Sequence, residues 1–80
     1  MYLKDLINLR INKLCNDRNI SINKLCTICG ITQSTLGNLK SRPTTNVTVL
    51  TVMRICRGLD ISLKDFFDDY TFDISNIDDD

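Results

Sequence analysis

A glutamine, a serine and an asparagine near the middle of this sequence have side chains suited to reading DNA. Gln33 and Asn38 carry amides that each donate and accept hydrogen bonds, and Ser34 adds a small hydroxyl beside the first. Such side chains pair with base edges in the major groove, where both amides suit adenine. Gly37 lies between them at a cost in helix stability of about 1 kcal/mol relative to alanine, which indicates close approach of another molecule. The alternative is an ordinary solvated helix face.

Two short helices joined by a tight turn are predicted to position these side chains. The first helix follows Ser21, whose hydroxyl can cap it. Gly30 can take the positive φ that ends this helix, and Ile31 is apolar enough to fill the corner between the two helices. A second helix then runs from its cap, Thr32, to about residue 40. Apolar residues at helical spacing make up the first helix: Ile22, Leu25, Cys26, Ile28 and Cys29. The inward face of the second helix would carry Thr35, Leu36 and Leu39.

Length and composition favour one small binding domain over an enzyme. The chain has 80 residues, 42% of them hydrophobic, which suits a single domain with a marginal core. It contains neither histidine nor glutamate, so the commonest general bases and the imidazole metal ligand are missing. We therefore expect no enzymatic activity and no cofactor. No apolar run is long enough to span a membrane and no signal-peptide pattern is present, so the expected location is the cytoplasm.

The formal net charge is zero, but the charges are separated along the chain. Ten basic and three acidic residues lie before residue 65, giving that part a net charge of +7. Residues 65–80 hold seven aspartates and no basic residue, giving −7. The basic part could neutralise DNA phosphates, whereas the acidic tail would repel DNA unless it points away.

Four cysteines allow two interpretations. Cys26 and Cys29 form a C-x-x-C pair and, with Cys15 and Cys56, would suffice for a zinc or redox site. However, a second C-x-x-C is missing, and three of the cysteines fall on apolar faces of predicted helices. Free cysteine at such positions behaves as a small buried hydrophobe. We therefore expect core packing and no metal site.

The remaining elements are predicted from helical periodicity and capping residues. An apolar stripe of Leu3, Ile7, Ile11 and Leu14, with Leu6 beside it, predicts a helix over residues 3–15 that ends near Asn19. Thr48 is expected to cap a helix that buries Val49, Val52, Met53, Ile55 and Cys56 and closes at Gly58. Ser62 is expected to cap a helix from Leu63 to about Tyr70 that buries Phe66 and Phe67. Residues 71–75 alternate polar and apolar side chains, which predicts an extended segment able to pair with a second copy.

The order and spacing of these features resemble the helix-turn-helix of the Cro/C1-repressor-like (XRE-type) family of DNA-binding regulators. The resemblance covers residues 7–67. It is carried by Ser21, Leu25, Cys26, Gly30, Ile31, Thr32, Gln33, Ser34, Leu36 and Leu39, and by residues 48–67, which are similar to the family's fourth helix, linker and fifth helix. It implies a compact all-α domain of five helices over residues 1–70, followed by an acidic tail, residues 71–80, that is disordered or dimerising.

The resemblance also implies a function and a set of contacts. The chain would be a short transcriptional regulator that binds double-stranded DNA as a homodimer at a palindromic operator, with no small-molecule effector evident. Helix three, about residues 32–40, would enter the major groove. The expected base contacts are Gln33, Ser34 and Asn38, with Thr32 and Thr35. The expected backbone contacts are Lys40, Ser41 and Arg42, with Asn23 and Lys24 in place of the family's frequent glutamine, which is Ile22 here.

A second function remains open at this point. Ile22 and Ile28 are apolar at positions that are commonly polar in the family. The chain could therefore be an accessory or antitoxin-like protein-interaction module with the same fold. Exposure of both isoleucines on one patch would favour that interpretation.

Overall fold

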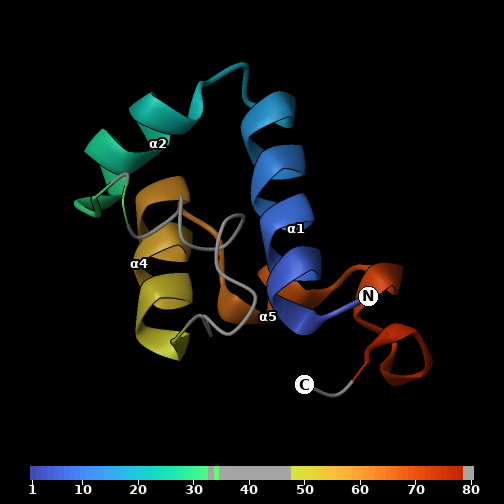
Figure 1. The fold of residues 1–80 in the computed structure, drawn as a ribbon. Coiled ribbons are helices and arrows are strands. Elements are labelled where there is room, and N and C mark those ends of the chain that lie inside the picture. The colour runs from blue at the N-terminus through green and yellow to red at the C-terminus, as the bar shows by residue number, and fades with distance from the viewer. Residues whose placement is uncertain (33, 35–47, 79–80) are drawn as a thin grey trace.

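The computed structural model of the chain describes residues 1–32, 34 and 48–78. Within these ranges the fold is all-helical, with an isolated bridge between Tyr2 and Asp78 and no strand, which confirms the predicted class. The elements are α1 (Leu3–Asp17), α2 (Ile22–Cys29), α4 (Val49–Leu59), α5 (Leu63–Phe67) and the 3-10 turns η1 (Tyr70–Phe72) and η2 (Ile74–Asn76) (Figure 1). None of these helices is long and apolar enough to cross a membrane. The predicted third helix lies outside the described residues except for Thr32 and Ser34.

One hydrophobic core joins the four α-helices that the structure describes. Leu25 of α2, Ile55 of α4 and Phe66 of α5 are fully buried, and Ile11 of α1 is nearly so. Several of the apolar positions predicted from periodicity belong to this core: Ile7, Ile11, Leu14, Leu25, Cys26, Val52, Ile55, Cys56 and Phe66. Leu3 and Val49 were expected to be buried but are 46% and 70% exposed, because each is the first residue of its helix and lies beyond the packed stripe.

Local capping chemistry sets the ends of the helices largely as predicted. The side chains of Ser21, Thr48 and Ser62 each accept a hydrogen bond from a backbone N–H in the first turn of α2, α4 and α5. Asn19 and Gly30 take the left-handed conformation at φ 53° and φ 68°, as expected at these two helix ends. The capping residues therefore determine where α2 begins and where it turns.

Gly58 does not close α4, contrary to the sequence prediction. It lies inside the helix, and Asp60 takes the left-handed position at φ 57° instead. A Cβ atom at residue 58 would lie 2.5 Å from Cys29 Sγ and 3.1 Å from Cys29 Cα. The glycine is needed because α2 approaches α4 closely at this point, and this contact between helices is not visible from a local pattern.

The C-terminal residues also differ from the prediction. The helix expected to reach Tyr70 ends at Phe67, which is 39% exposed and therefore not buried as expected. Residues 71–75, which were expected to be extended, belong instead to the 3-10 turns η1 and η2 and the residue between them. Asp69 and Asp73 start these turns in the same way, each accepting hydrogen bonds from the backbone N–H and the hydroxyl of the residue two positions later. These short side-chain bonds favour turns over a strand.

We predict that Gly58→Ala destabilises the fold by about 1–2 kcal/mol, because overpacking against Cys29 outweighs the gain of about 1 kcal/mol in helix propensity. Urea unfolding followed by circular dichroism measures this change. Cys29→Ala with Gly58→Ala should be less destabilised than the sum of the two single variants, since the alanine removes the clashing sulfur. A Gly58→Ala protein as stable as the parent would contradict the close packing.

Candidate nucleic-acid interface

The turn after α2 is held rigidly by its backbone. The N–H groups of Gly30 and Ile31 both donate to the carbonyl of Cys26, the second at 3.2 Å. The Ile31 side chain packs against the hydrophobic core and anchors the turn from inside. Thr32 and Ser34 follow directly, both exposed, and Ser34 has helical backbone. The turn therefore leaves Thr32 and Ser34, which lie at the start of the predicted third helix, exposed to solvent.

Four of the predicted site residues belong to the described structure, and all four are exposed: Asn23, Lys24, Thr32 and Ser34. They form two groups. Asn23 and Lys24 lie in the first turn of α2, whereas Thr32 and Ser34 lie just beyond its other end. The helix α2 itself is about 12 Å long, eight residues at 1.5 Å each. The predicted contacts Gln33, Thr35, Asn38, Lys40, Ser41 and Arg42 lie outside the described residues.

Lys24 is an exposed cation in the first turn of α2. The backbone N–H of Lys24 donates to Ser21 Oγ at 3.1 Å and so caps the helix. The cationic side chain of Lys24 is exposed at the same end of the helix. The partial positive charge of a helix amino end and a lysine side chain both attract phosphate. This geometry is compatible with the predicted backbone contact by Lys24.

The two isoleucines that could favour a protein-interaction module do not share an exposed patch. Ile22 is partly buried and packs against the hydrophobic core. Ile28 is 42% exposed, yet its Cγ2 lies 3.2 Å from the position that a Cβ atom on Gly58 would take. At least part of each side chain therefore packs within the domain.

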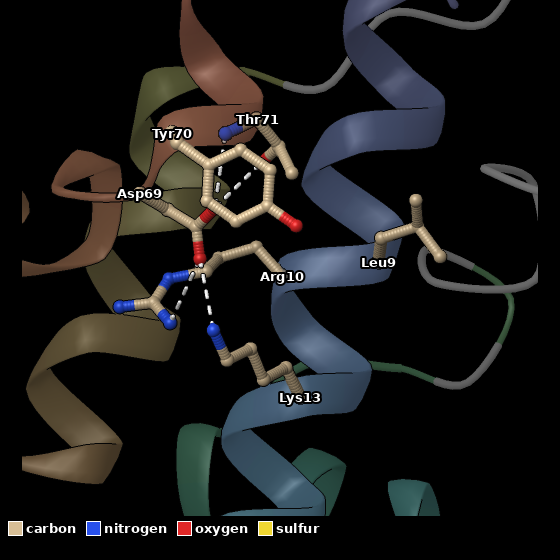
Figure 2. A pocket seen from close by; sticks show the side chains of 6 residues that line it. All are labelled: Leu9, Arg10, Lys13, Asp69, Tyr70 and Thr71. Atoms are coloured by element: carbon tan, nitrogen blue, oxygen red, sulfur yellow. Dashed lines mark hydrogen bonds and ion pairs between the residues drawn. The ribbon is translucent and has the colours of Figure 1, made fainter.

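Two basic residues of α1 are directed at the C-terminal segment, as Figure 2 shows. Arg10 donates from Nε to the carbonyl of Phe66 at 2.7 Å and from a terminal nitrogen to the carbonyl of Asp65 at 2.9 Å. Arg10 and Lys13 also pair with the Asp69 carboxylate at 3.7 Å and 3.2 Å. Both cations belong to the basic part of the sequence, but local patterns do not reveal this pairing, since the partners lie more than 50 residues apart.

The Asp69 carboxylate is stabilised in its charged form. Its pKa falls from 3.8 to about 2, chiefly because the backbone N–H of Thr71 donates to it, and further because the Thr71 hydroxyl and Lys13 do so. The Asp69 side chain is only 6% exposed. This buried, ionised group fixes η1 against α1.

The acidic turns lie away from the candidate interface. In Figure 1, η1 and η2 lie to the right of α1 beside the N-terminus, whereas α2 and α4 lie to its left. The N-terminal amine pairs with Asp78 at 2.7 Å, and the Asp78 N–H donates to the Met1 carbonyl at 2.9 Å. The sequence does not decide whether the tail points away from DNA. In the structure, the described part of the tail is held on the far side of α1 from α2.

The four cysteines belong to the packing of the domain. Cys15, Cys26 and Cys56 are buried and Cys29 is half-buried, with its thiol donating to the carbonyl of Ile55 at 3.7 Å. Burial raises the pKa of all four thiols, so they are protonated at neutral pH. The expected core packing is confirmed for Cys26 and Cys56. No group of three or more potential metal ligands is found among the residues that the structure describes.

A capped helix, a left-handed glycine turn and the exposed start of a second helix define a helix-turn-helix, a class of DNA-binding domain. The chain belongs to the family of Cro/C1-type HTH DNA-binding domains, which matches residues 10–71. This confirms the resemblance inferred from the sequence. The chain is also similar to a solved structure described as "Crystal structure of the prophage Lp1 protein 11", with a TM-score of 0.80 and 28% identity. That match covers 88% of this chain and 93% of the other. No curated protein sequence matches.

We predict that Asp69→Asn lowers the free energy of unfolding by about 1–2 kcal/mol at pH 7. Because the folded-state pKa lies below the ordinary value, this stabilisation is present above pH 3.8 and is lost as the pH falls to about 2. Urea unfolding between pH 7 and pH 2 should therefore show the two proteins converging at low pH.

Asp73→Asn is the matched control for this experiment. Asp73 makes the same two hydrogen bonds in its own turn, but it is exposed and has no basic partner among the described residues. We expect a smaller loss than for Asp69→Asn. Equal losses in the two variants, or a pH-independent loss for Asp69→Asn, would contradict the role assigned to Asp69.

Proposed function

We propose that this protein is a sequence-specific regulator of transcription that binds double-stranded DNA through its helix-turn-helix. The observation that carries the proposal is the match of residues 10–71 to the Cro/C1-type DNA-binding family. The described geometry supports it, because Thr32 and Ser34 emerge exposed from a turn fixed by the Cys26 carbonyl. A rigid turn lets the following side chains meet base edges at low entropic cost.

The segment after the turn is the part that we assign to the major groove. Gln33 and Asn38 are the side chains proposed to make paired hydrogen bonds to adenine, with Ser34 beside them and Thr32 and Thr35 as further contacts. Lys24 and Asn23, at the opposite end of α2, would contact the DNA backbone and set the register of the domain. Lys40, Ser41 and Arg42 are proposed to add backbone contacts on the other side.

We further propose that the protein binds a palindromic operator as a symmetric homodimer, which the small size of the unit supports. A single recognition helix reads few base pairs, and two copies related by a two-fold axis would read half-sites about one helical turn apart. Dimerisation would also add buried surface to a domain that is marginal by itself.

The distribution of charge supports DNA binding despite a net charge of zero. Asp69 is neutralised by Arg10 and Lys13, and Asp78 by the N-terminal amine. The turns η1 and η2, which lie between these two aspartates in the chain, are on the far side of α1 from α2 (Figure 1). Lys24 is thus exposed to phosphate without a described carboxylate pairing with it. The repulsion expected from the acidic tail is reduced both by distance and by these ion pairs.

We predict that Gln33→Ala weakens binding to the cognate site by about 1–3 kcal/mol and leaves binding to random duplex almost unchanged. The cognate site is first selected from a library of random duplexes with the parent protein. Fluorescence anisotropy on the selected and scrambled duplexes then measures both affinities. Equal losses on the two duplexes would refute base recognition by Gln33.

A backbone contact should behave differently. We predict that Lys24→Ala and Arg42→Ala weaken binding to all duplexes similarly and reduce the salt slope by about 1. Lys13→Ala is the matched control, since it removes the same charge from a side chain that pairs with Asp69. Its salt slope should stay close to that of the parent. No selected duplex at all, with the protein shown to be folded, would favour a protein-interaction module over DNA binding.

A further inference from the structure

The last turn of α2 meets α4 at a contact that is too close for a side chain on residue 58. A Cβ atom on Gly58 would lie 2.5 Å from Cys29 Sγ, 3.1 Å from Cys29 Cα and 3.2 Å from Ile28 Cγ2. Three residues earlier on α4, the Ile55 carbonyl accepts a hydrogen bond from the Cys29 thiol at 3.7 Å. In Figure 1, α2 lies beside the C-terminal end of α4, where this contact is made. The missing side chain of Gly58 therefore sets how closely α2 approaches α4.

The turn after α2 is bonded to the helical turn that makes this contact. The N–H groups of Gly30 and Ile31 both donate to the carbonyl of Cys26, three residues before Cys29. Gly30 is held at φ 68°, and the Ile31 side chain packs against the hydrophobic core. Thr32 follows directly and is exposed. Because both intervening residues are hydrogen-bonded to α2, a displacement of Cys29 is carried to Thr32.

A side chain on residue 58 would displace the backbone of α2. Rotation of the Cys29 thiol can relieve the contact with the sulfur atom, but it leaves the contact with Cys29 Cα in place. A contact of that length requires the neighbouring atom to give by a few tenths of an ångström. A close-packed interior transmits such a shift to the residues joined to it.

Base recognition is more sensitive to this shift than attraction to the DNA backbone. Paired hydrogen bonds to a base edge require aligned donors and acceptors, and binding sites tolerate displacements of only about 0.5 Å or rotations of about 10–20°. Attraction between a cationic side chain and phosphate acts over about 10 Å at moderate salt. A small movement of the helix-turn-helix therefore costs affinity for the cognate site and little affinity for random duplex.

We infer that Gly58 is a positioning residue for base recognition. By admitting Cys29 against α4, it fixes the placement of the turn from which Thr32 and Ser34 emerge. The inference rests on the proposed function and deepens it, because it assigns part of the sequence specificity to a residue of α4, outside the helix-turn-helix.

A positioning role is distinguishable from a purely structural one. Loss of stability lowers the folded fraction, which weakens the apparent affinity for every duplex by the same factor. The ratio of the affinities for cognate and random duplex is then unchanged. A displaced helix-turn-helix lowers this ratio, because only the base contacts are weakened.

The test measures this ratio by fluorescence anisotropy for the parent protein and for Gly58→Ala. The duplexes are one selected with the parent and its scrambled form, at a temperature where circular dichroism shows the variant to be folded. We expect Gly58→Ala to weaken binding to the selected duplex roughly tenfold, as for the loss of one base contact. Binding to the scrambled duplex should weaken by less than about twofold. An unchanged ratio in folded Gly58→Ala would overturn the inference.

Asp69→Asn is the stability-matched control. Its predicted loss of stability is similar, but Asp69 fixes η1, which lies on the far side of α1 from α2 (Figure 1). Its affinity ratio should equal that of the parent. An equal fall in the ratio for Asp69→Asn and Gly58→Ala would overturn the inference, since general destabilisation would then explain both.

Cys29→Ala tests the contact from the other helix. Combined with Gly58→Ala, it removes the shortest of the three contacts and should restore part of the lost ratio. No recovery would overturn the role of the sulfur contact. If Gly58→Ala does not fold, the double variant is compared with Cys29→Ala, and the remaining contacts with Cys29 Cα and Ile28 should still lower its ratio.

The outcome for the parent protein separates this inference from the proposed function. A parent that prefers no duplex would overturn both. A parental preference that survives unchanged in Gly58→Ala would overturn the inference alone and leave the proposed function in place.

Discussion

One arginine connects the first helix of this domain to its last, and the arrangement of the whole chain depends on that contact. Arg10 donates to the carbonyls of Phe66 and Asp65, at the end of a helix of only five residues. The last carbonyls of a helix lack the regular partner of the helix interior, and Arg10 donates to both, adding to the bond that the Asp65 carbonyl accepts from the Asp68 N–H at 3.3 Å. By closing α5, Arg10 holds the fully buried Phe66 in the core and brings Asp69 within ion-pair distance.

The same contact divides the surface of the protein by charge. Arg10 and Lys13 are used to hold the acidic C-terminal turns, and those turns therefore lie beside α1 rather than near α2 (Figure 1). A short chain with no net charge can in this way present an exposed lysine at the start of α2 and the acidic turns on separate faces. Because these ion pairs hold the acidic turns beside α1, both faces can occur in one small domain.

The orientation of the helix-turn-helix depends on a second, apolar constraint. α2 meets α4 where Cys29 lies against Gly58, and a side chain on residue 58 would push the helices apart. The turn that follows α2 is joined to the core by Ile31. The exposed residues Thr32 and Ser34 are thus positioned by packing beneath them, and a loss of that packing would move the proposed DNA contacts.

The sequence by itself determined the local features of this protein. Ser21, Thr48 and Ser62 mark helix starts through their own side-chain bonds, Gly30 marks a turn through its backbone freedom, and the apolar spacing identifies most of the core. Together these are sufficient to recognise the family, and they predict the residues of the DNA site.

Only the tertiary structure decided the features that join distant segments. The local pattern wrongly predicts a helix end at Gly58, because the role of this glycine depends on Cys29 in another helix. The C-terminal turns were expected to be extended, because alternation of side chains does not reveal that Asp69 caps a turn and pairs with α1. Pairing between charges far apart in sequence depends on which helix faces meet, and that follows from packing of the whole core rather than from any local pattern.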